Sequence, residues 1–313
     1  MTDMRQIRSE GARANFAELQ APAVLPAILL VLCGVTLFSL SDTLSKLLRE
    51  QLPAVEIGWM RYVVFTGFAA LLAARGRYAG LWPRRPGLQA LRGVTLVGSA
   101  VLFIAGLGYL PVAEATAINF VSPAFITALS IPFLGEIVGV RRWAAVLVGL
   151  AGVLIVVRPG TGAVQAAALF PLSSALCWAA AIVVTRRMGT SDRAETTLFW
   201  SAAVGLVLLT GLVPFDFVRP GARQIGIAVV LGLCNSVGQY LVILAYRRAA
   251  ASLLAPFSYA QLLSSTALGY AVFGAVPDRT TLLGGGVIVL SGLYTAHRER
   301  LRARERKRGL AAG

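Results

Sequence analysis

Long apolar stretches separated by short polar segments run along almost the whole chain. A membrane-spanning helix needs about 20 mostly apolar residues, and ten stretches approach or exceed that length. They cover residues 23–48, 54–74, 89–108, 112–133, 142–157, 166–188, 194–213, 222–245, 249–273 and 280–296. The stretches are continuously apolar rather than alternating, so the pattern predicts an all-α membrane protein and not a transmembrane barrel.

The ten stretches fall into two halves that resemble each other at an offset of about 140 residues. Phe38 begins a segment that Lys46 closes eight residues later, and Trp178 begins one that Arg186 closes at the same spacing. Five spans in each half is an odd number, so the second half enters the membrane from the opposite side. The sequence therefore predicts two inverted five-helix repeats related by a pseudo-two-fold axis in the membrane plane.

This repeat defines the expected organisation of the chain. Small residues on one face of the fifth and tenth spans predict close helix contacts, either for sliding or for static packing. These small residues are Ala145, Gly149, Gly152, Gly284, Gly285 and Gly292. The expected segments are an N-terminal tail at 1–22, a first repeat at 23–158, a linker at 159–165, a second repeat at 166–296 and a basic tail at 297–313.

Composition and charge support a membrane protein. The mean hydropathy of the 313 residues is +0.74 and only 14% are charged, whereas soluble domains have about 25% charged residues. A net charge of +15 is compatible with nucleic-acid binding, but the distribution of the cations explains it better. With the N-terminus in the cytoplasm, 22 of the 29 Lys and Arg residues fall on the cytoplasmic side. The positive-inside rule then predicts ten spans with both termini cytoplasmic and no nucleic-acid partner.

Among the ionisable residues within predicted spans or at their ends, five are candidates for a functional role: Asp42, Lys46, Glu56, Arg61 and Glu114. An ionisable side chain in hydrocarbon costs several kcal/mol and usually lines a cavity or finds a partner. In the predicted topology all five lie near the outer face. We expect them to form a charge cluster that gates or attracts a solute, with a structural ion-pair network as the alternative.

The charge cluster is not repeated in the second half. At the 140-residue offset, Asp42 corresponds to Ile182 and Arg61 corresponds to Ser201. The gates at the two sides of the membrane are therefore expected to differ in chemistry.

Uncharged polar and aromatic residues within the spans indicate where a central cavity would lie. Asn119 and Ser122 share a face of the fourth span beside Pro123, which frees the carbonyl of Asn119. Trp178 can stack on a flat or cationic solute. The alternatives are interhelical hydrogen bonding for the amides and packing for Trp178. The candidate solute contacts are Ser39, Asn119, Ser122, Trp178, Asn235, Gln239, Tyr259 and Gln261.

Residues that would indicate catalysis or metal binding are sparse. Three cysteines lie in predicted spans without metal-ligand spacing, and the single histidine, His297, ends the last span. The sequence contains no nucleophile–base constellation, P-loop or ATPase motif. It therefore predicts no catalytic residue, metal site or cofactor, and a gradient or the solute itself would supply the energy. Glu114 is a candidate proton carrier.

Several segments of the first half carry a family resemblance. They resemble the first-repeat pattern of the drug/metabolite transporter superfamily, EamA type, and the similarity extends over about residues 25–297. The segments are Leu110–Ile118, Pro123, Leu134-Gly135-Glu136, Arg141-Arg142-Trp143 and Gly149–Val153. The resemblance implies ten helices in an inverted five-plus-five repeat around a central cavity for small organic solutes.

Two further segments are similar to one branch of that family. Residues 38–42 with Lys46, and residues 156–160, resemble bacterial carriers for S-adenosylmethionine or riboflavin uptake. The second repeat departs from the family pattern at Ala275, where a glutamate is common. A role that needs a glutamate in both halves is therefore not expected.

The resemblance and the residues together predict a secondary transporter in a bacterial-type inner membrane. It would move an S-adenosylmethionine-, riboflavin- or amino-acid-like solute by alternating access. An amino-acid or drug exporter of the same fold is the main alternative, and a lipid enzyme or a channel is a more distant one. The expected partners are a small organic solute, membrane lipid and a coupling proton.

Overall fold

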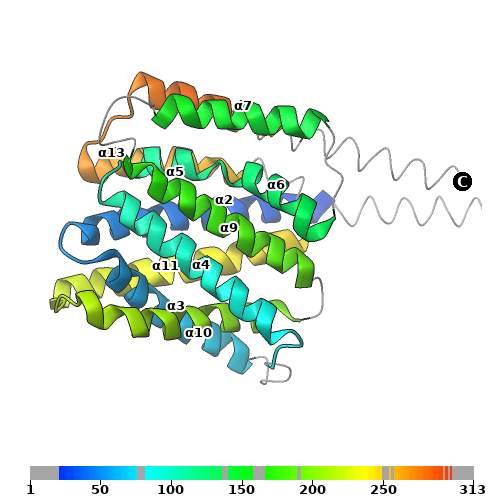
Figure 1. The fold of residues 1–313 in the computed structure, drawn as a ribbon. Helices are drawn as coiled ribbons and strands as arrows, with labels where there is room; N and C mark the ends of the chain where they lie inside the picture. Colours follow the sequence, from blue (N-terminus) through cyan, green and yellow to red (C-terminus); the bar gives the residue numbers. More distant parts are fainter. Residues whose placement is uncertain are drawn as a thin grey trace, which may run out of the picture.

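The computed structural model describes residues 21–75, 82–135, 140–157, 166–188, 192–248, 254, 257–291, 293–294 and 297. All regular structure in these residues is helical (Figure 1). The expected linker at 159–165 and most of both expected tails lie outside the described residues. The helices are α2 (Ala21–Arg49), α3 (Ala54–Arg75), α4 (Pro86–Leu107), α5 (Val112–Asn119), α6 (Ser122–Leu134), α7 (Val140–Val157), α9 (Leu169–Met188), α10 (Ala194–Leu212), the 3-10 helix η1 (Val213–Asp216), α11 (Ala222–Arg248) and α13 (Ala260–Phe273).

Seven spans in the described residues are long and apolar enough to cross a membrane. They correspond to seven of the ten predicted stretches, with α5 and α6 together forming one span. The other three stretches contain shorter apolar helices, at Leu147–Val156, Ala260–Phe273 and Arg279–Ser291. The all-helical, multi-pass character is confirmed, whereas the count of ten spans and the side of the termini stay predictions.

The helix contacts occur in matched pairs across the two halves. Helix α2 packs along α11, and α4 packs along α9 in the same way. The contact of α3 with α11 is matched by that of α10 with α4, and the contact of α2 with α13 by that of α9 with α6. The contact of α3 with α10 joins corresponding elements of the two halves and therefore has no separate counterpart. Such pairing is what a two-fold relation between the halves produces.

Figure 1 shows α3 and α10 along one side of the bundle, and α7 with the helix of residues 279–291 along the opposite side. This second pair is in backbone contact at two glycines. A Cβ atom on Gly152 would lie 3.0 Å from the carbonyl oxygen of Gly284 and 2.8 Å from Ile288 Cγ1. The predicted close contact between the fifth and tenth spans is therefore present, although Gly292 lies outside the described residues.

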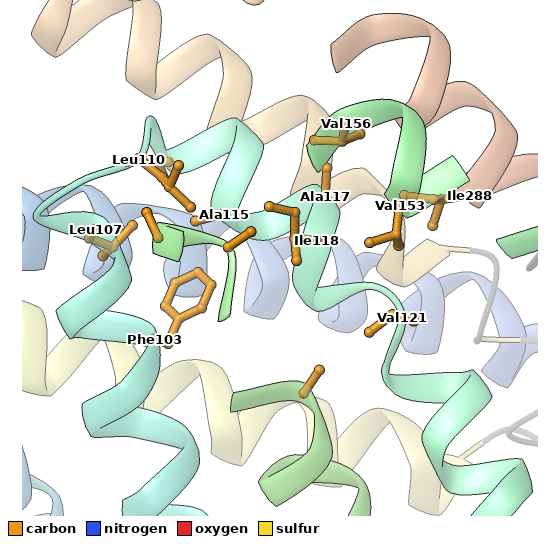
Figure 2. Packing of buried hydrophobic residues seen from close by; sticks show 14 residues of the cluster. Phe103, Leu107, Leu110, Ala115, Ala117, Ile118, Val121, Val153, Val156 and Ile288 are labelled. Atoms are coloured by element: carbon orange, nitrogen blue, oxygen red, sulfur yellow. The ribbon is translucent and has the colours of Figure 1, made fainter. Parts of the chain in front are cut away.

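The fourth predicted span is broken near its middle. Helix α5 ends at Asn119 and α6 begins at Ser122. Between them the N–H groups of residues 120 and 121 donate to carbonyls three residues earlier. Pro123 has no N–H to donate to the carbonyl of Asn119, which explains why regular helix does not continue through this point. Figure 2 shows Ala117, Ile118 and Val121 near the break, in the core cluster that also contains Val153 and Val156 of α7.

We expect Gly205→Ala to destabilise the protein by about 1–3 kcal/mol, as overpacking does. A Cβ atom on Gly205 in α10 would overlap the ring of Tyr62 on α3 and lie 2.7 Å from Val97 Cγ2. Tyr62 is only 5% exposed, so its ring has little room to move. Gly67→Ala in α3 is the matched control because nothing lies within 4 Å of the added methyl group. Thermal unfolding in detergent compares the two variants, and equal melting temperatures would contradict the prediction.

Candidate functional site

The break between α5 and α6 meets an irregular point of the other half. Tyr259 precedes α13, and its ring packs against that of Phe120 with the centroids 5.1 Å apart and the planes tilted by 43°. The two residue numbers differ by 139, which is close to the repeat offset. The contact therefore joins corresponding points of the two halves. Discontinuous helices at a repeat interface are the usual solute-binding elements of secondary transporters.

Two polar side chains on α5, close in sequence to this contact, have no hydrogen-bond partner. Thr116 Oγ1 and Asn119 Oδ1 are both buried and unpaired, and their three-residue spacing places them on the same face of the helix. Leaving a buried polar atom unpaired costs about 1–3 kcal/mol, so these atoms mark a place where a hydrogen-bond donor would be favourable. Asn119 is one of the predicted solute contacts. Thr116 was not predicted, since a threonine in an apolar helix gives no sequence signal.

A second polar group lies where α2, α3 and α13 meet. Ser39 is fully buried and donates a hydrogen bond to the carbonyl oxygen of Gln261 at 3.1 Å. Asp42 is 9% exposed and interacts with the side chains of Arg61 and Gln261. Arg61 is 7% exposed, and its Nε atom has no partner. The structure thus brings together four residues that the sequence analysis had selected from three separate spans.

A cavity of about 210 Å³ lies at the end of the bundle where α2 ends, which we call the Lys46 end. Its lining includes Lys46, Glu114, Phe273 and Asp278. Pockets for drug-sized ligands run from about 300 to 1,000 Å³, so this cavity can admit only part of such a molecule. Its lining is charged, and its volume is below that of a complete site for such a molecule.

Lys46 is held by backbone carbonyls and not by its helix neighbour Asp42. Its Nζ atom donates to the carbonyl oxygens of Leu107 and Leu110, each at 2.8 Å. The ammonium also lies 5.7 Å from the centroid of the Phe273 ring, within the range of a cation–π interaction. An ammonium has three donors, so two are used by the connection between α4 and α5 and one remains for the cavity.

The predicted charge cluster is divided by its contacts. Glu56 is fully buried, and its Oε2 atom accepts a hydrogen bond from the backbone N–H of Val218 at 3.1 Å. That contact directs Glu56 toward the segment between η1 and α11. The five charges therefore form three groups: Asp42 with Arg61, Lys46 with Glu114 at the cavity, and Glu56 with Val218.

The remaining predicted contacts are half-buried side chains in the spans, namely Ser122, Trp178, Asn235 and Gln239. Within the described part of the chain, none of these four side chains forms a hydrogen bond. A polar group inside a span that has no protein partner is more stable facing water or a solute than facing lipid. Their role as solute contacts stays a prediction.

Sequence reasoning missed one charged residue inside a span. Arg92 lies three residues after the start of the predicted stretch 89–108 and was counted as a loop cation. In the structure it donates hydrogen bonds to Thr185 on α9 and Ser201 on α10. Its position inside an apolar stretch was the available signal. Among the described residues, no group of three or more His, Cys, Asp and Glu side chains is arranged to hold a metal ion.

Repeated apolar helices, paired contacts across two halves and helix breaks at their interface define a multi-pass membrane protein with duplicated architecture. The EamA-like transporter family matches residues 25–158 and again residues 165–296. The chain belongs to the EamA-like transporter family and is a multi-pass protein of the bacterial-type inner membrane. A solved crystal structure with 20% sequence identity has the same fold, with a TM-score of 0.62 over 90% of this chain and 99% of the other.

Curated relatives with similar sequences have several names. A riboflavin transporter of Rhizobium johnstonii is 30% identical over 97% of this chain and 99% of its own length. An S-adenosylmethionine uptake transporter of Rickettsia bellii is 27% identical over 84% of this chain and 90% of its own. A pseudopaline exporter of Pseudomonas aeruginosa is 29% identical over 84% of this chain and 93% of its own. All three are named as transporters of small organic molecules.

Proposed function

We propose that this protein is a secondary transporter that moves a small organic metabolite across the inner membrane by alternating access. The observation that carries the proposal is the meeting of two irregular helix points, one from each half, at Phe120 and Tyr259. A site at that position can be reached from either side when the halves exchange their roles. The unpaired oxygens of Thr116 and Asn119, on the helix that ends there, supply acceptors for a bound solute.

The chemistry of the proposed site favours a hydrogen-bonding, flat or weakly charged solute. It offers unpaired acceptors on α5, the ring of Trp178 and the amides of Asn235 and Gln239. Di- and tri-anionic solutes usually require several buried Lys or Arg residues, and the proposed contacts contain none. An S-adenosylmethionine-, riboflavin- or amino-acid-like solute fits this description. The complete set proposed is Ser39, Thr116, Asn119, Ser122, Trp178, Asn235, Gln239, Tyr259 and Gln261.

The charged groups have a separate proposed role in access to the site. Lys46 and Glu114 line the cavity at the Lys46 end, which the positive-inside distribution assigns to the outer side. Asp42 and Arg61 lie deeper, so a solute that enters through the cavity passes them next. We propose that this pair gates the outer side, and that Glu114 is the candidate carrier of a coupling proton.

Export is the second candidate direction. The pseudopaline exporter has nearly the same identity to this chain as the riboflavin transporter and the S-adenosylmethionine uptake transporter. Inverted repeats allow both directions, because the two conformations are related by the exchange of the halves.

Flux measurements in proteoliposomes test the proposed function. S-adenosylmethionine, riboflavin and several amino acids are offered with and without a proton gradient. We expect saturable uptake of one of the first two, with about tenfold loss in Asn119→Ala and Asn235→Ala because each removes a solute hydrogen bond. Ser236→Ala is the control next to Asn235, since the one hydrogen bond of the Ser236 side chain among the described residues goes to the carbonyl of Gly232 in its own helix. Transport of amino acids alone would overturn the substrate proposal, and no flux of any compound would contradict the transporter.

A further inference from the structure

Arg92 is held by two hydroxyl groups that belong to the other half of the chain. Its Nε atom donates to Thr185 Oγ1 at 2.8 Å, and its Nη1 atom donates to Ser201 Oγ. Each hydroxyl donates in turn to a carbonyl of its own helix, so each presents lone pairs to the guanidinium. Arg92 lies 15 residues before Leu107, where Lys46 binds. That spacing is about 22 Å along α4, so Arg92 lies near the start of α4 and the Lys46 contact lies at its other end.

Neighbouring polar contacts extend this link at the Arg92 end. Gln89 is fully buried and donates to Asp192 Oδ2 at 2.9 Å and to Thr197 Oγ1 at 3.1 Å. The backbone N–H of Arg84 donates to the other oxygen of Asp192 at 2.9 Å. These bonds connect the start of α4 with the start of α10. The first half is thus joined to the second by hydrogen bonds at the end remote from the cavity.

The repeat offset relates the Arg92 site to the Arg61 site. At 140 residues, Arg92 corresponds to Gly232, Thr185 to Ser45, and Ser201 to Arg61. The Arg92 site and the Arg61 site therefore correspond to each other, and each contains one arginine. The two arginines come from non-equivalent helices, because Arg92 lies on α4 and Arg61 lies on α3. One arginine faces a carboxylate and the other faces two neutral hydroxyls. The two ends of the bundle thus each contain an arginine, but the partners of the two arginines differ in charge.

We propose that Arg92 is the positioning residue that closes the second end of the solute path by binding Thr185 and Ser201. The proposal rests on the alternating-access function above. A half-buried cation inside a span needs partners, and these partners hold α4 against α9 and α10 as long as water stays out. Both described partners are neutral hydroxyls. Replacing them by water therefore costs less free energy than separating the two charges of a buried ion pair. This closure is therefore reversible on the scale that a transport cycle requires.

Cysteine labelling of the full-length protein in proteoliposomes tests this proposal without a solute. Ala181→Cys is introduced as the reporter after the three native cysteines are replaced, because Ala181 is 1% exposed and lies one turn before Thr185. We expect Arg92→Ala to raise its labelling by a membrane-impermeant maleimide about tenfold. The double variant Thr185→Ala/Ser201→Ala is expected to do the same while it keeps the arginine. Arg85→Ala is the matched control, since this exposed arginine donates to the carbonyl of Arg187 at the same end.

A second reporter separates opening at one end from general loosening. Ala115→Cys is fully buried near the Lys46 end, and its labelling is expected to stay the same or fall in the Arg92→Ala protein. An equal rise at both reporters, or no rise at Ala181→Cys, would overturn the proposal. Solute flux is measured in parallel. If the labelling changes as expected and no compound is transported, the Arg92 closure is supported and the transporter assignment fails.

Discussion

Arg61→Gln is expected to lower the transport rate at least about 100-fold while the protein still inserts into the membrane. The variant leaves the buried carboxylate of Asp42 without its cationic neighbour. Removing one partner of a buried pair costs about 3–5 kcal/mol. If about 2.7 kcal/mol of this cost falls on one conformation of the transport cycle, the rate falls by a factor of about 100. Asp42→Asn is expected to have a similar effect, because it leaves Arg61 uncompensated. Initial flux is measured in proteoliposomes that contain equal amounts of inserted protein.

The double variant Asp42→Asn/Arg61→Gln separates gating from structural pairing. It leaves no isolated charge, so an ion pair that serves structure alone would be replaced without loss and flux would return. A pair that gates or attracts the solute acts through its charges, and flux would stay low. We expect the second result. Normal flux in both single variants would contradict a role of this pair in transport.

Lys46→Met is expected to lower the free energy of unfolding by about 2–3 kcal/mol. The substitution removes two charge-assisted hydrogen bonds of 2.8 Å and leaves the carbonyl oxygens of Leu107 and Leu110 without that donor. These bonds tie the end of α2 to the connection between α4 and α5, which forms one wall of the cavity. Denaturant or thermal unfolding in detergent measures the loss, and Lys46→Arg is expected to retain most of the stability.

Arg49→Met is the matched control for Lys46→Met. Arg49 is a second cation in the last turn of α2, but its only described hydrogen bond is a 3.3 Å contact with the carbonyl of Leu52. We expect its loss to cost less than about 1 kcal/mol. Equal effects of the two substitutions would show that the general charge near the helix end, and not the two carbonyl contacts, stabilises the structure.

The helical architecture could be predicted from the sequence because hydrocarbon leaves the backbone few alternatives. Backbone polar groups in a bilayer must be satisfied internally, so a continuous apolar stretch predicts a helix. The break at residues 120–121 was signalled in part by Pro123, which cannot donate to Asn119. The partner of that break, Tyr259, was selected only as a solute contact, although its separation of 139 residues from Phe120 is close to the repeat offset.

The arrangement of the charges could be predicted only in part. Depth along the membrane follows from position in a span, and this placed the five charges at one level. Which neighbour each side chain meets depends on its direction around the helix and on distant packing. Glu56 finds an N–H in a segment 162 residues away, and Arg92 finds hydroxyls 93 and 109 residues away. Such partners leave no local pattern, so the sequence did not select Arg92.

The contact between Phe120 and Tyr259 has a consequence for how transport direction can change during evolution. In the proposed alternating-access cycle, this contact joins corresponding points, so we expect it to be retained when the halves exchange their conformations and to add the same free energy to both states. A substitution there alters overall stability and leaves the ratio of the two states unchanged. In the proposed cycle the bonds of Arg92 exist in one state only, so we expect substitutions there to shift the ratio. Substitutions at Arg92 and its partners can thus change the preference for uptake or release during evolution. The contact between Phe120 and Tyr259 meanwhile preserves the fold.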